Sequence, residues 1–243
     1  MPIAIDLTGR VAIVTGGHGG LGRVIVSHLA SAGAKVVVFD RATDVPTTVS
    51  AECYEVDITD ENSVAAAVDR VFAKEKRIDI LVNNAGVQGP ILPVSEVSLA
   101  QWKETLAVNL TGTFICSQAV VPHMLKASWG RIVNISSVQG KEGTVFSGPY
   151  AVSKAGQITL AKVMGKELAT SGITVNCITP TVVDAGMIHG IDEDRKADLL
   201  QRIPMRRFCR PDEVADMVTF VASDACAFTT GAVFDLSGGR ATW

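Results

Sequence analysis

Hydrophobic positions along the chain follow two different periods. Short runs rich in Val and Ile are apolar at nearly every position, which indicates strands buried on both faces of a sheet. Longer stretches between them carry apolar residues three and four apart, the spacing of an amphipathic helix. The runs that predict strands are 11–14, 35–39, 80–82, 131–135, 174–178 and 232–235.

Helical patterns fill the gaps between these strands. Residues 63–72 place their apolar side chains on one face, and residues 211–222 begin with a proline suited to a first turn. Further helices are expected at 106–125 and 150–168. Alternation of apolar strands with helices predicts a doubly wound, Rossmann-type α/β fold, a parallel sheet of about seven strands flanked by helices.

A single domain is expected over residues 1–243. The 243 residues, of which 47% are hydrophobic and 19% charged, are enough to bury one sizeable core. No Pro/Ser linker, repeat or low-complexity tract divides the chain. The stretch 181–206 is less regular than the rest, so we expect a mobile segment there that covers the substrate.

Charge and composition favour small soluble partners. A net charge of -3, a pI near 5.8 and the lack of any Lys/Arg run predict no binding to nucleic acid or to an anionic membrane. Asp6 interrupts the apolar start, so no export signal is expected, and no apolar run reaches the roughly 18 residues of a membrane span. A cytoplasmic location is expected.

Cysteine and histidine give little support to disulfides or metals. The five cysteines are an odd number without a Cys-x-x-Cys pair, and the four histidines form no His-x-x-x-His pair. No metal site is expected.

A glycine-rich turn follows the first predicted strand and leads into a helix. Glycines let backbone N–H groups approach a pyrophosphate closely, and a helix N-terminus adds a favourable partial charge. The turn fits the general Gly-x-Gly-x-x-Gly pattern through Gly17, Gly19 and Gly22. It also fits Thr-Gly-x-x-x-Gly-x-Gly through Thr15, Gly16, Gly20 and Gly22.

Asp40 indicates which dinucleotide binds. It closes the second predicted strand, where a carboxylate accepts hydrogen bonds from the adenosine ribose of NAD and repels the 2′-phosphate of NADP. Arg41 beside it would tolerate a phosphate, but Gly17 offers no second cation inside the turn. NAD is therefore expected, with NADP as the less favoured alternative.

Several motifs spread over residues 9–239 together resemble the short-chain dehydrogenase/reductase family. Each motif is unspecific alone, but the set is specific and covers nearly the whole chain. The motifs are Thr15-Gly16-x-x-x-Gly20-x-Gly22, Asp57-Ile58, Asn83-Asn84-Ala85-Gly86, Asn109, Ser136-Ser137, Tyr150-x-x-x-Lys154 and a turn at Pro180. The resemblance implies an NAD-dependent oxidoreductase that interconverts a secondary alcohol and a ketone.

The spacing of Tyr150 and Lys154 has a physical reason. Four residues apart on a helix, both project from one face, so the ammonium can lower the pKa of the tyrosine from its usual value of about 10. A phenolate then accepts the alcohol proton as hydride leaves for nicotinamide. Family spacing selects Ser137 over Ser136 as the hydroxyl that holds the substrate oxygen.

The resemblance assigns further residues. Lys154 is expected to hold the nicotinamide ribose, and Asn109 resembles the residue that fixes a water for proton relay, a structural helix-bend amide being the alternative. The family often has a glycine and a threonine where this chain has Thr181 and Ala185, which puts one hydroxyl contact in doubt. The cofactor-binding residues implied are Gly16, Gly20, Leu21, Gly22, Asp40, Asp57, Ile58, Asn83, Ala85, Gly86, Tyr150, Lys154 and Val183.

The tail from 237 to 243 resembles that of sugar and sugar-acid dehydrogenases in the family. In the family's tetramers a C-terminus can approach a neighbouring active site, so Arg240 is expected to bind a substrate carboxylate, a solvated terminal arginine being the alternative. The candidate partners for substrate hydroxyls are Gln88, Ser137, Gln139, Glu142 and Thr181. We expect a sugar acid, such as a 2-keto-3-deoxy acid, in carbohydrate catabolism, and a homotetramer formed through the helices 106–125 and 150–168.

Two alternatives stay open. A 3-oxoacyl-[acyl-carrier-protein] reductase would share the segments 203–205 and 210–215, but it would carry basic residues where this chain has Ser128-Trp129 and Ser171. A non-catalytic NAD-sensing module would need neither Tyr150 nor Lys154, and both are present.

Overall fold

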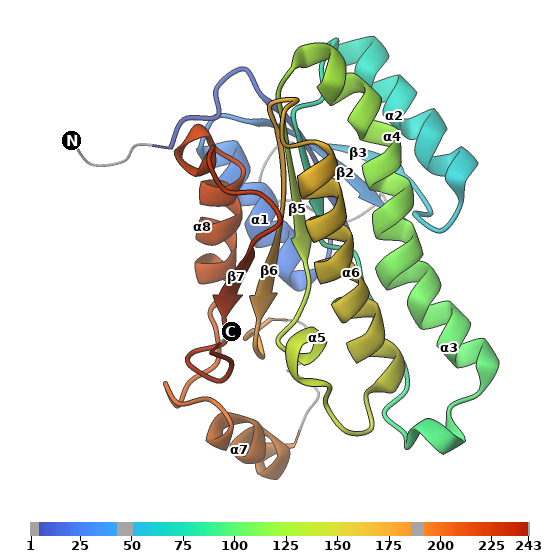
Figure 1. The fold of residues 1–243 in the computed structure, drawn as a ribbon, viewed down its shortest axis with the longest axis vertical. Helices are drawn as coiled ribbons and strands as arrows, with labels where there is room; N and C mark the ends of the chain where they lie inside the picture. The colour runs from blue at the N-terminus through green and yellow to red at the C-terminus, as the bar shows by residue number, and fades with distance from the viewer. Residues whose placement is uncertain (1–4, 43–50, 186–191, 243) are drawn as a thin grey trace.

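The computed structural model describes residues 5–42, 51–185 and 192–242, and strands alternate with helices along it (Figure 1). The strands are β1 (Val11–Thr15), β2 (Lys35–Asp40), β3 (Glu52–Glu55), β4 (Ile80–Asn83), β5 (Gly130–Ile135), β6 (Ile173–Pro180) and β7 (Val233–Leu236). The helices are α1 (Gly20–Ser31), α2 (Glu61–Glu75), α3 (Leu99–Leu106), α4 (Gly112–Ala127), α5 (Gln139–Glu142), α6 (Gly148–Glu167), α7 (Glu193–Gln201) and α8 (Pro211–Val221).

The described strands form one parallel, seven-stranded sheet in the order β3-β2-β1-β4-β5-β6-β7. This confirms the predicted doubly wound fold. The strand order reverses between β1 and β4, and open α/β sheets bind ligands outside the carboxyl ends of their strands at such a reversal. These ends point toward the bottom of Figure 1.

Helices cover both faces of the sheet (Figure 1). Successive strand residues serve opposite faces, so Val36 and Val38 pack in the core with α1 and α8, whereas Val37 and Phe39 pack in the core with α2 and α4. Strands that are buried on both faces must be apolar at almost every position, which is why their runs were visible in the sequence.

Strand β3 was not predicted from the sequence. β3 pairs only with β2 at the edge of the sheet, and Tyr54 is its one fully buried side chain. An edge strand needs few apolar positions, so its sequence carries little signal.

The helix predicted at 106–125 is longer than expected. It runs from Leu99 to Ala127 through a π-helical turn at Ala107–Thr111, and Ser98 and Gln101 form a capping box at its start. Within the described residues this run alone is long and apolar enough to cross a membrane by length and composition. Val120 and Met124 lie in the core, so the run packs as a helix of the second layer.

The segment predicted to be irregular, 181–206, contains α7. Asp192 caps this helix by accepting a hydrogen bond from the N–H of Arg195 at 2.8 Å. Residues 186–191 of the segment lie outside the described residues, and its mobility stays a prediction.

Candidate active site

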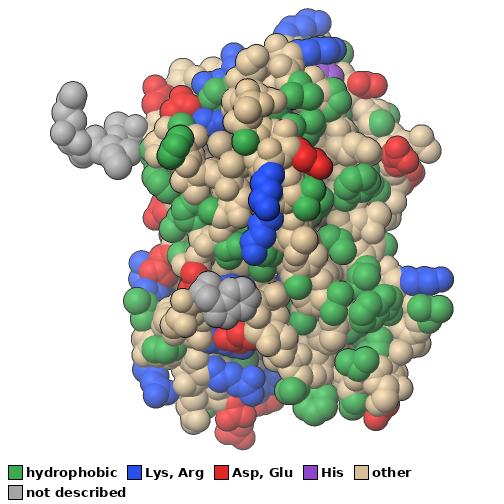
Figure 2. All heavy atoms as spheres, viewed as in Figure 1, with side chains coloured by type: hydrophobic (Ala, Val, Ile, Leu, Met, Phe, Trp, Pro, Cys, Tyr) green, Lys and Arg blue, Asp and Glu red, His purple; other side chains and the backbone are tan. Residues whose placement is uncertain are grey.

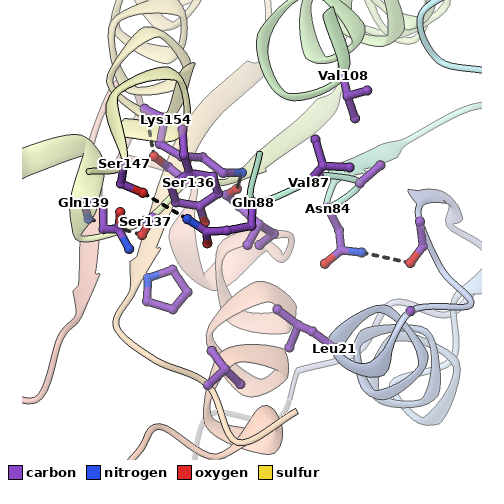
Figure 3. A pocket seen from close by; sticks show the side chains of 18 of the residues that line it. Leu21, Asn84, Val87, Gln88, Val108, Ser136, Ser137, Gln139, Ser147 and Lys154 are labelled. Atoms are coloured by element: carbon purple, nitrogen blue, oxygen red, sulfur yellow. Dashed lines mark hydrogen bonds between the residues drawn. The ribbon is translucent and has the colours of Figure 1, made fainter. Parts of the chain in front are cut away.

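A cavity of about 1180 Å³ opens at the carboxyl edge of the sheet. Its walls come from the glycine-rich turn, the ends of β2, β4 and β5, the start of α6, and α7. Figure 3 shows Leu21 and Asn84 on one side of this cavity and Ser137, Gln139 and Lys154 on the other. Residues more than a hundred positions apart therefore share one site.

Close packing explains the glycines of the turn. Gly16 has a φ of +63°, and a Cβ added there would lie 2.9 Å from the Cα of Ala85. A Cβ on Gly22 would collide with the carbonyl oxygen of Gly16 and lie 2.9 Å from the Cα of Gly17. Gly16 and Gly22, two glycines of the Thr-Gly-x-x-x-Gly-x-Gly pattern, therefore have no room for a side chain.

We expect Gly22→Ala to destabilise the protein and weaken dinucleotide binding. The turn must shift to accommodate the methyl group, and overpacking of this kind costs roughly 1–3 kcal/mol, or a Tm lower by about 3–10 °C. Gly19→Ala is the matched control, because its φ of -66° suits alanine and its Cβ would meet only the Gly16 oxygen, at 3.3 Å. Equal melting temperatures for the two variants would contradict this explanation.

Asn84, which the sequence analysis did not select, ties the turn to the end of β4. Its side-chain amide donates to the carbonyls of Thr15 and Gly16, each at 3.0 Å, while the Thr15 hydroxyl accepts from the N–H groups of Asn84 and Ala85. Asn83 lies behind the cavity wall and is not among the lining residues; its amide donates to Ser117 and Asn134. A direct cofactor contact by Asn83 stays a prediction.

Asp40 lies at one end of the cavity with its carboxylate held in place. One oxygen accepts from the N–H of His18 at 3.0 Å, and the other accepts from the N–H of Arg41 at 2.8 Å. The His18 ring is fixed in turn by the Ala42 carbonyl at 2.6 Å and the Cys53 sulfur at 3.1 Å. The geometry presents a fixed carboxylate to whatever occupies this end.

Other residues predicted to bind the cofactor also line the cavity. Asp57 lies on its wall, and hydrogen bonds from the hydroxyl and N–H of Thr59 hold the pKa of Asp57 below its usual value. The remaining ones that line it are Gly20, Ile58, Ala85, Gly86 and Val183.

Tyr150, Ser137 and Lys154 converge on the opposite end. Pro149 at the start of α6 fixes the first turn, which carries Tyr150. The Ser137 hydroxyl hydrogen-bonds the Tyr150 phenol, and the ammonium nitrogen of Lys154 lies 5.7 Å from the centre of the Tyr150 ring. That nitrogen donates to the carbonyl of Ile135 at 2.7 Å and to the side-chain oxygen of Gln157 at 3.1 Å.

The expected lowering of the tyrosine pKa by lysine is wrong for the chain as the structure describes it. Burial raises the pKa of Tyr150, and the hydrogen bond with Ser137 offsets this only in part. Burial also lowers the pKa of Lys154 to about 8. Burial is the largest cause of both shifts, and two of the Lys154 donors are directed at Ile135 and Gln157.

Asn109 lies behind the cavity, fully buried in the π-helical turn. Its side-chain oxygen accepts from the N–H of Val87 at 2.8 Å, and its amide donates to the Val87 carbonyl and to Ser153. Its own carbonyl accepts from Gln157 at 2.7 Å and from Thr113 at 2.8 Å. The predicted role in holding a water would require one of these bonds to be given up.

The predicted substrate residues divide into two groups. Gln88, Gln139 and Thr181 line the cavity, and Gln88 donates to Ser147 at 2.9 Å (Figure 3). Among the described residues, the buried side-chain oxygens of Gln139 and Thr181 have no hydrogen-bond partner. Buried polar atoms without partners are rare, so these two are suited to a polar ligand.

Glu142 and Arg240 instead bind each other, with Nη2 of Arg240 2.6 Å from a carboxylate oxygen of Glu142. Nε of Arg240 donates to the same carboxylate at 2.9 Å. Arg240 lines the cavity from its own chain, but Glu142 offsets much of its charge. The sequence analysis missed Arg195 and Arg202, which also line the cavity and belong to the segment in which it expected no helix.

Comparison with known proteins gives matches over nearly the whole chain. A family model described as enoyl-(acyl carrier protein) reductase matches residues 16–241. The chain is 38% identical over 240 residues to 2-dehydro-3-deoxy-L-rhamnonate dehydrogenase (NAD(+)) of Sphingomonas sp. (strain SKA58), covering 97% of this chain and 96% of that protein. It is 39% identical over 245 residues to the 3-oxoacyl-[acyl-carrier-protein] reductase of Aquifex aeolicus, covering 97% and 98%. The crystal structure of gox2181 has a TM-score of 0.92 at 32% identity, covering 99% and 98% of the two chains.

Proposed function

The chain belongs to the short-chain dehydrogenase/reductase family, as an oxidoreductase acting on CH–OH groups, and we propose that it oxidises a secondary hydroxyl of a sugar acid with NAD. The observation that carries the proposal is the cavity itself. It brings the glycine turn and Asp40 to one end, and Ser137, Tyr150 and Lys154 to the other.

The residues fit a dinucleotide. The turn leads into α1, whose first residue, Gly20, lines the cavity and whose N-terminus has no side-chain cap, which suits a pyrophosphate at the helix N-terminus. The fixed carboxylate of Asp40 is suited to the adenosine ribose, and a relative at 38% identity carries NAD(+) in its name. When bound, NAD supplies the hydride acceptor.

Tyr150 is the proposed proton-transfer residue. Ser137 hydrogen-bonds the phenol, so its hydroxyl is placed to hold the substrate oxygen against Tyr150. In oxidation, Tyr150 as the phenolate accepts the alcohol proton, and the carbon-bound hydrogen leaves with its electron pair as hydride. Because burial raises the pKa of Tyr150, its phenolate needs a cation nearby; in the proposal Lys154 stabilises it electrostatically and offers its remaining N–H to the ribose.

Particular polar and basic side chains within the lining support a sugar acid. The unpartnered oxygens of Gln139 and Thr181 suit substrate hydroxyls. Lys and Arg side chains gather beside Asp and Glu around α7, at the lower end of Figure 2. Arg195 and Arg202 of this region line the cavity, and because Arg240 is paired with Glu142, we assign the substrate carboxylate chiefly to Arg202, which also lines an adjoining pocket with Arg240.

Arg202→Gln is expected to raise the KM for a free sugar acid by about three- to tenfold. A charge-assisted hydrogen bond accounts for such a change, reduced here because Arg202 is exposed. The KM for threitol, an uncharged polyol, should stay within about twofold in the same assay. Arg206→Gln is the control, since Arg206 bonds to the carbonyl of Gln201 and is not among the lining residues. Equal losses with the acid and the polyol would contradict the assignment.

A 3-oxoacyl-[acyl-carrier-protein] reductase is the second candidate, because one relative at 39% identity bears that name. The missing basic residues weigh less against it than the sequence suggested. Ser128, Trp129 and Ser171 precede β5 and β6, at the edge opposite the cavity within one chain (Figure 1).

Substrate preference separates the two candidates. We expect the purified protein to oxidise free sugar acids with NAD and to leave an acyl-thioester with NADPH nearly untouched. The opposite preference would replace the proposal with the reductase.

A cytoplasmic location and a homotetramer complete the proposal. Phe114, Val152 and Val163 on α4 and α6 are exposed, which supports association through these helices. Light scattering of the purified protein tests the subunit count.

A further inference from the structure

We propose that Gln157 is a positioning residue for the reaction: its amide fixes the ammonium of Lys154 so that one N–H of this group stays directed at the cavity. The inference rests on the proposed function, because it takes Tyr150 and Lys154 as the proton-transfer pair.

The amide of Gln157 spans the distance between Lys154 and the π-helical turn. Gln157 follows Lys154 by three residues on α6 and is fully buried. Its oxygen accepts from Lys154 at 3.1 Å, while its nitrogen donates to the Asn109 carbonyl at 2.7 Å and to the Thr113 hydroxyl at 2.8 Å. Both donors of the amide and its oxygen are therefore engaged, which leaves the side chain a single orientation.

This arrangement sets the direction of Lys154. An ammonium has three N–H donors, and the Ile135 carbonyl and Gln157 take two of them. The nitrogen faces Gly86 on the cavity wall, where an added Cβ would lie 3.5 Å away. The third donor is thus kept for the cavity.

Gln157 also supports the charged form of Lys154. Burial lowers the pKa of that lysine to about 8, and an accepting oxygen opposes this effect. The titratable groups that face Lys154 are Tyr150 on its own helix and Cys177 on β6. Burial raises the pKa of Cys177 to about 12, so its thiol stays neutral. Burial is therefore the main influence on the charge of Lys154, and the accepting oxygens of Ile135 and Gln157 oppose it.

The test is the pH profile of kcat for NAD-dependent oxidation of 2-dehydro-3-deoxy-L-rhamnonate, or of the best sugar acid found in the substrate comparison. Gln157→Met keeps the length of the side chain but removes the acceptor, so Lys154 is charged less readily and the phenolate loses support. We expect the rise of kcat with pH to move up by about one unit, with kcat at pH 7 about tenfold lower and recovered at higher pH.

A second Gln157 variant and a control variant accompany this test. Gln157→Glu preserves the shape, and its carboxylate offsets the charge of Lys154, so the profile should move in the same direction. Ser117→Ala removes buried hydrogen bonds from the neighbouring turn of α4 without touching Gln157 or Lys154, so it should lower the Tm and leave the midpoint unchanged. A folded Gln157 variant whose midpoint stays within about 0.2 units of the wild type would overturn the inference.

Different results would overturn the proposed function and the role of Gln157. If Tyr150→Phe kept its turnover, the proposed function would fall. If Tyr150→Phe were inactive while the Gln157 variants kept the wild-type profile, only the role of Gln157 would fall.

Discussion

Replacing Tyr150 with phenylalanine is expected to abolish turnover while NAD still binds. The variant lacks only the hydroxyl that Ser137 contacts, so the cavity keeps its shape but has no group to take the alcohol proton. General acid–base catalysis contributes about 10²- to 10⁴-fold, and we expect kcat to fall by about 10³-fold. Steady-state kinetics measure the loss, and calorimetry measures the Kd for NAD.

Tyr54→Phe is the matched control. The chain has two tyrosines, and the Tyr54 hydroxyl bonds to Glu52 at 2.8 Å, on the edge strand. This variant should retain full turnover. Activity surviving in Tyr150→Phe would favour the alternative of an NAD-sensing module or a different proton acceptor.

Asp40→Asn is expected to change the preference between NAD and NADP by about 100-fold. Asparagine keeps the shape but loses the charge, so the hydrogen bonds to the ribose weaken by about 1.5 kcal/mol, or roughly tenfold. Removing the repulsion of a 2′-phosphate, with Arg41 on the same wall, improves NADP by a similar factor. The ratio of kcat/KM for the two cofactors measures the change.

Asp57→Asn is the control for Asp40→Asn, because it removes a carboxylate from another part of the same cavity. Asp57 also lines the cavity, but the resemblance assigns it to the adenine, so the cofactor ratio should stay within about threefold. A ratio that changes equally in both variants would show that Asp40 does not discriminate between the cofactors.

The fold could be predicted because its strands are buried on both faces and so are apolar at nearly every position. The same reasoning could not find β3, where Tyr54 alone is fully buried. It also placed no helix in the segment of α7, whose residues include none that are fully buried. An element that contributes little to the core leaves little hydrophobic pattern.

The site could be predicted as far as its motifs reach. Tyr150, Lys154, Ser137 and the glycine turn line one cavity, as their positions in the sequence implied. The partners of these residues could not be predicted, because a motif does not record which buried groups a side chain meets. The pairing of Arg240 with Glu142 depends on two segments that only the fold brings together.

Gln157 is an exception of another kind. It follows Lys154 by one helical turn, so the spacing alone placed both on one face of α6. A glutamine on the buried face of a helix is unusual, and this could have been noticed in the sequence. Its three hydrogen bonds explain why a polar side chain is stable there.

The most direct test of the account is the absorbance of reduced nicotinamide in a mixture of the purified protein, NAD and 2-dehydro-3-deoxy-L-rhamnonate, with other sugar acids beside it. We predict NADH formation that requires both the sugar acid and Tyr150, and much slower formation of NADPH from NADP. No reduction of NAD with any sugar acid, together with oxidation of NADPH by an acyl-thioester, would contradict the account.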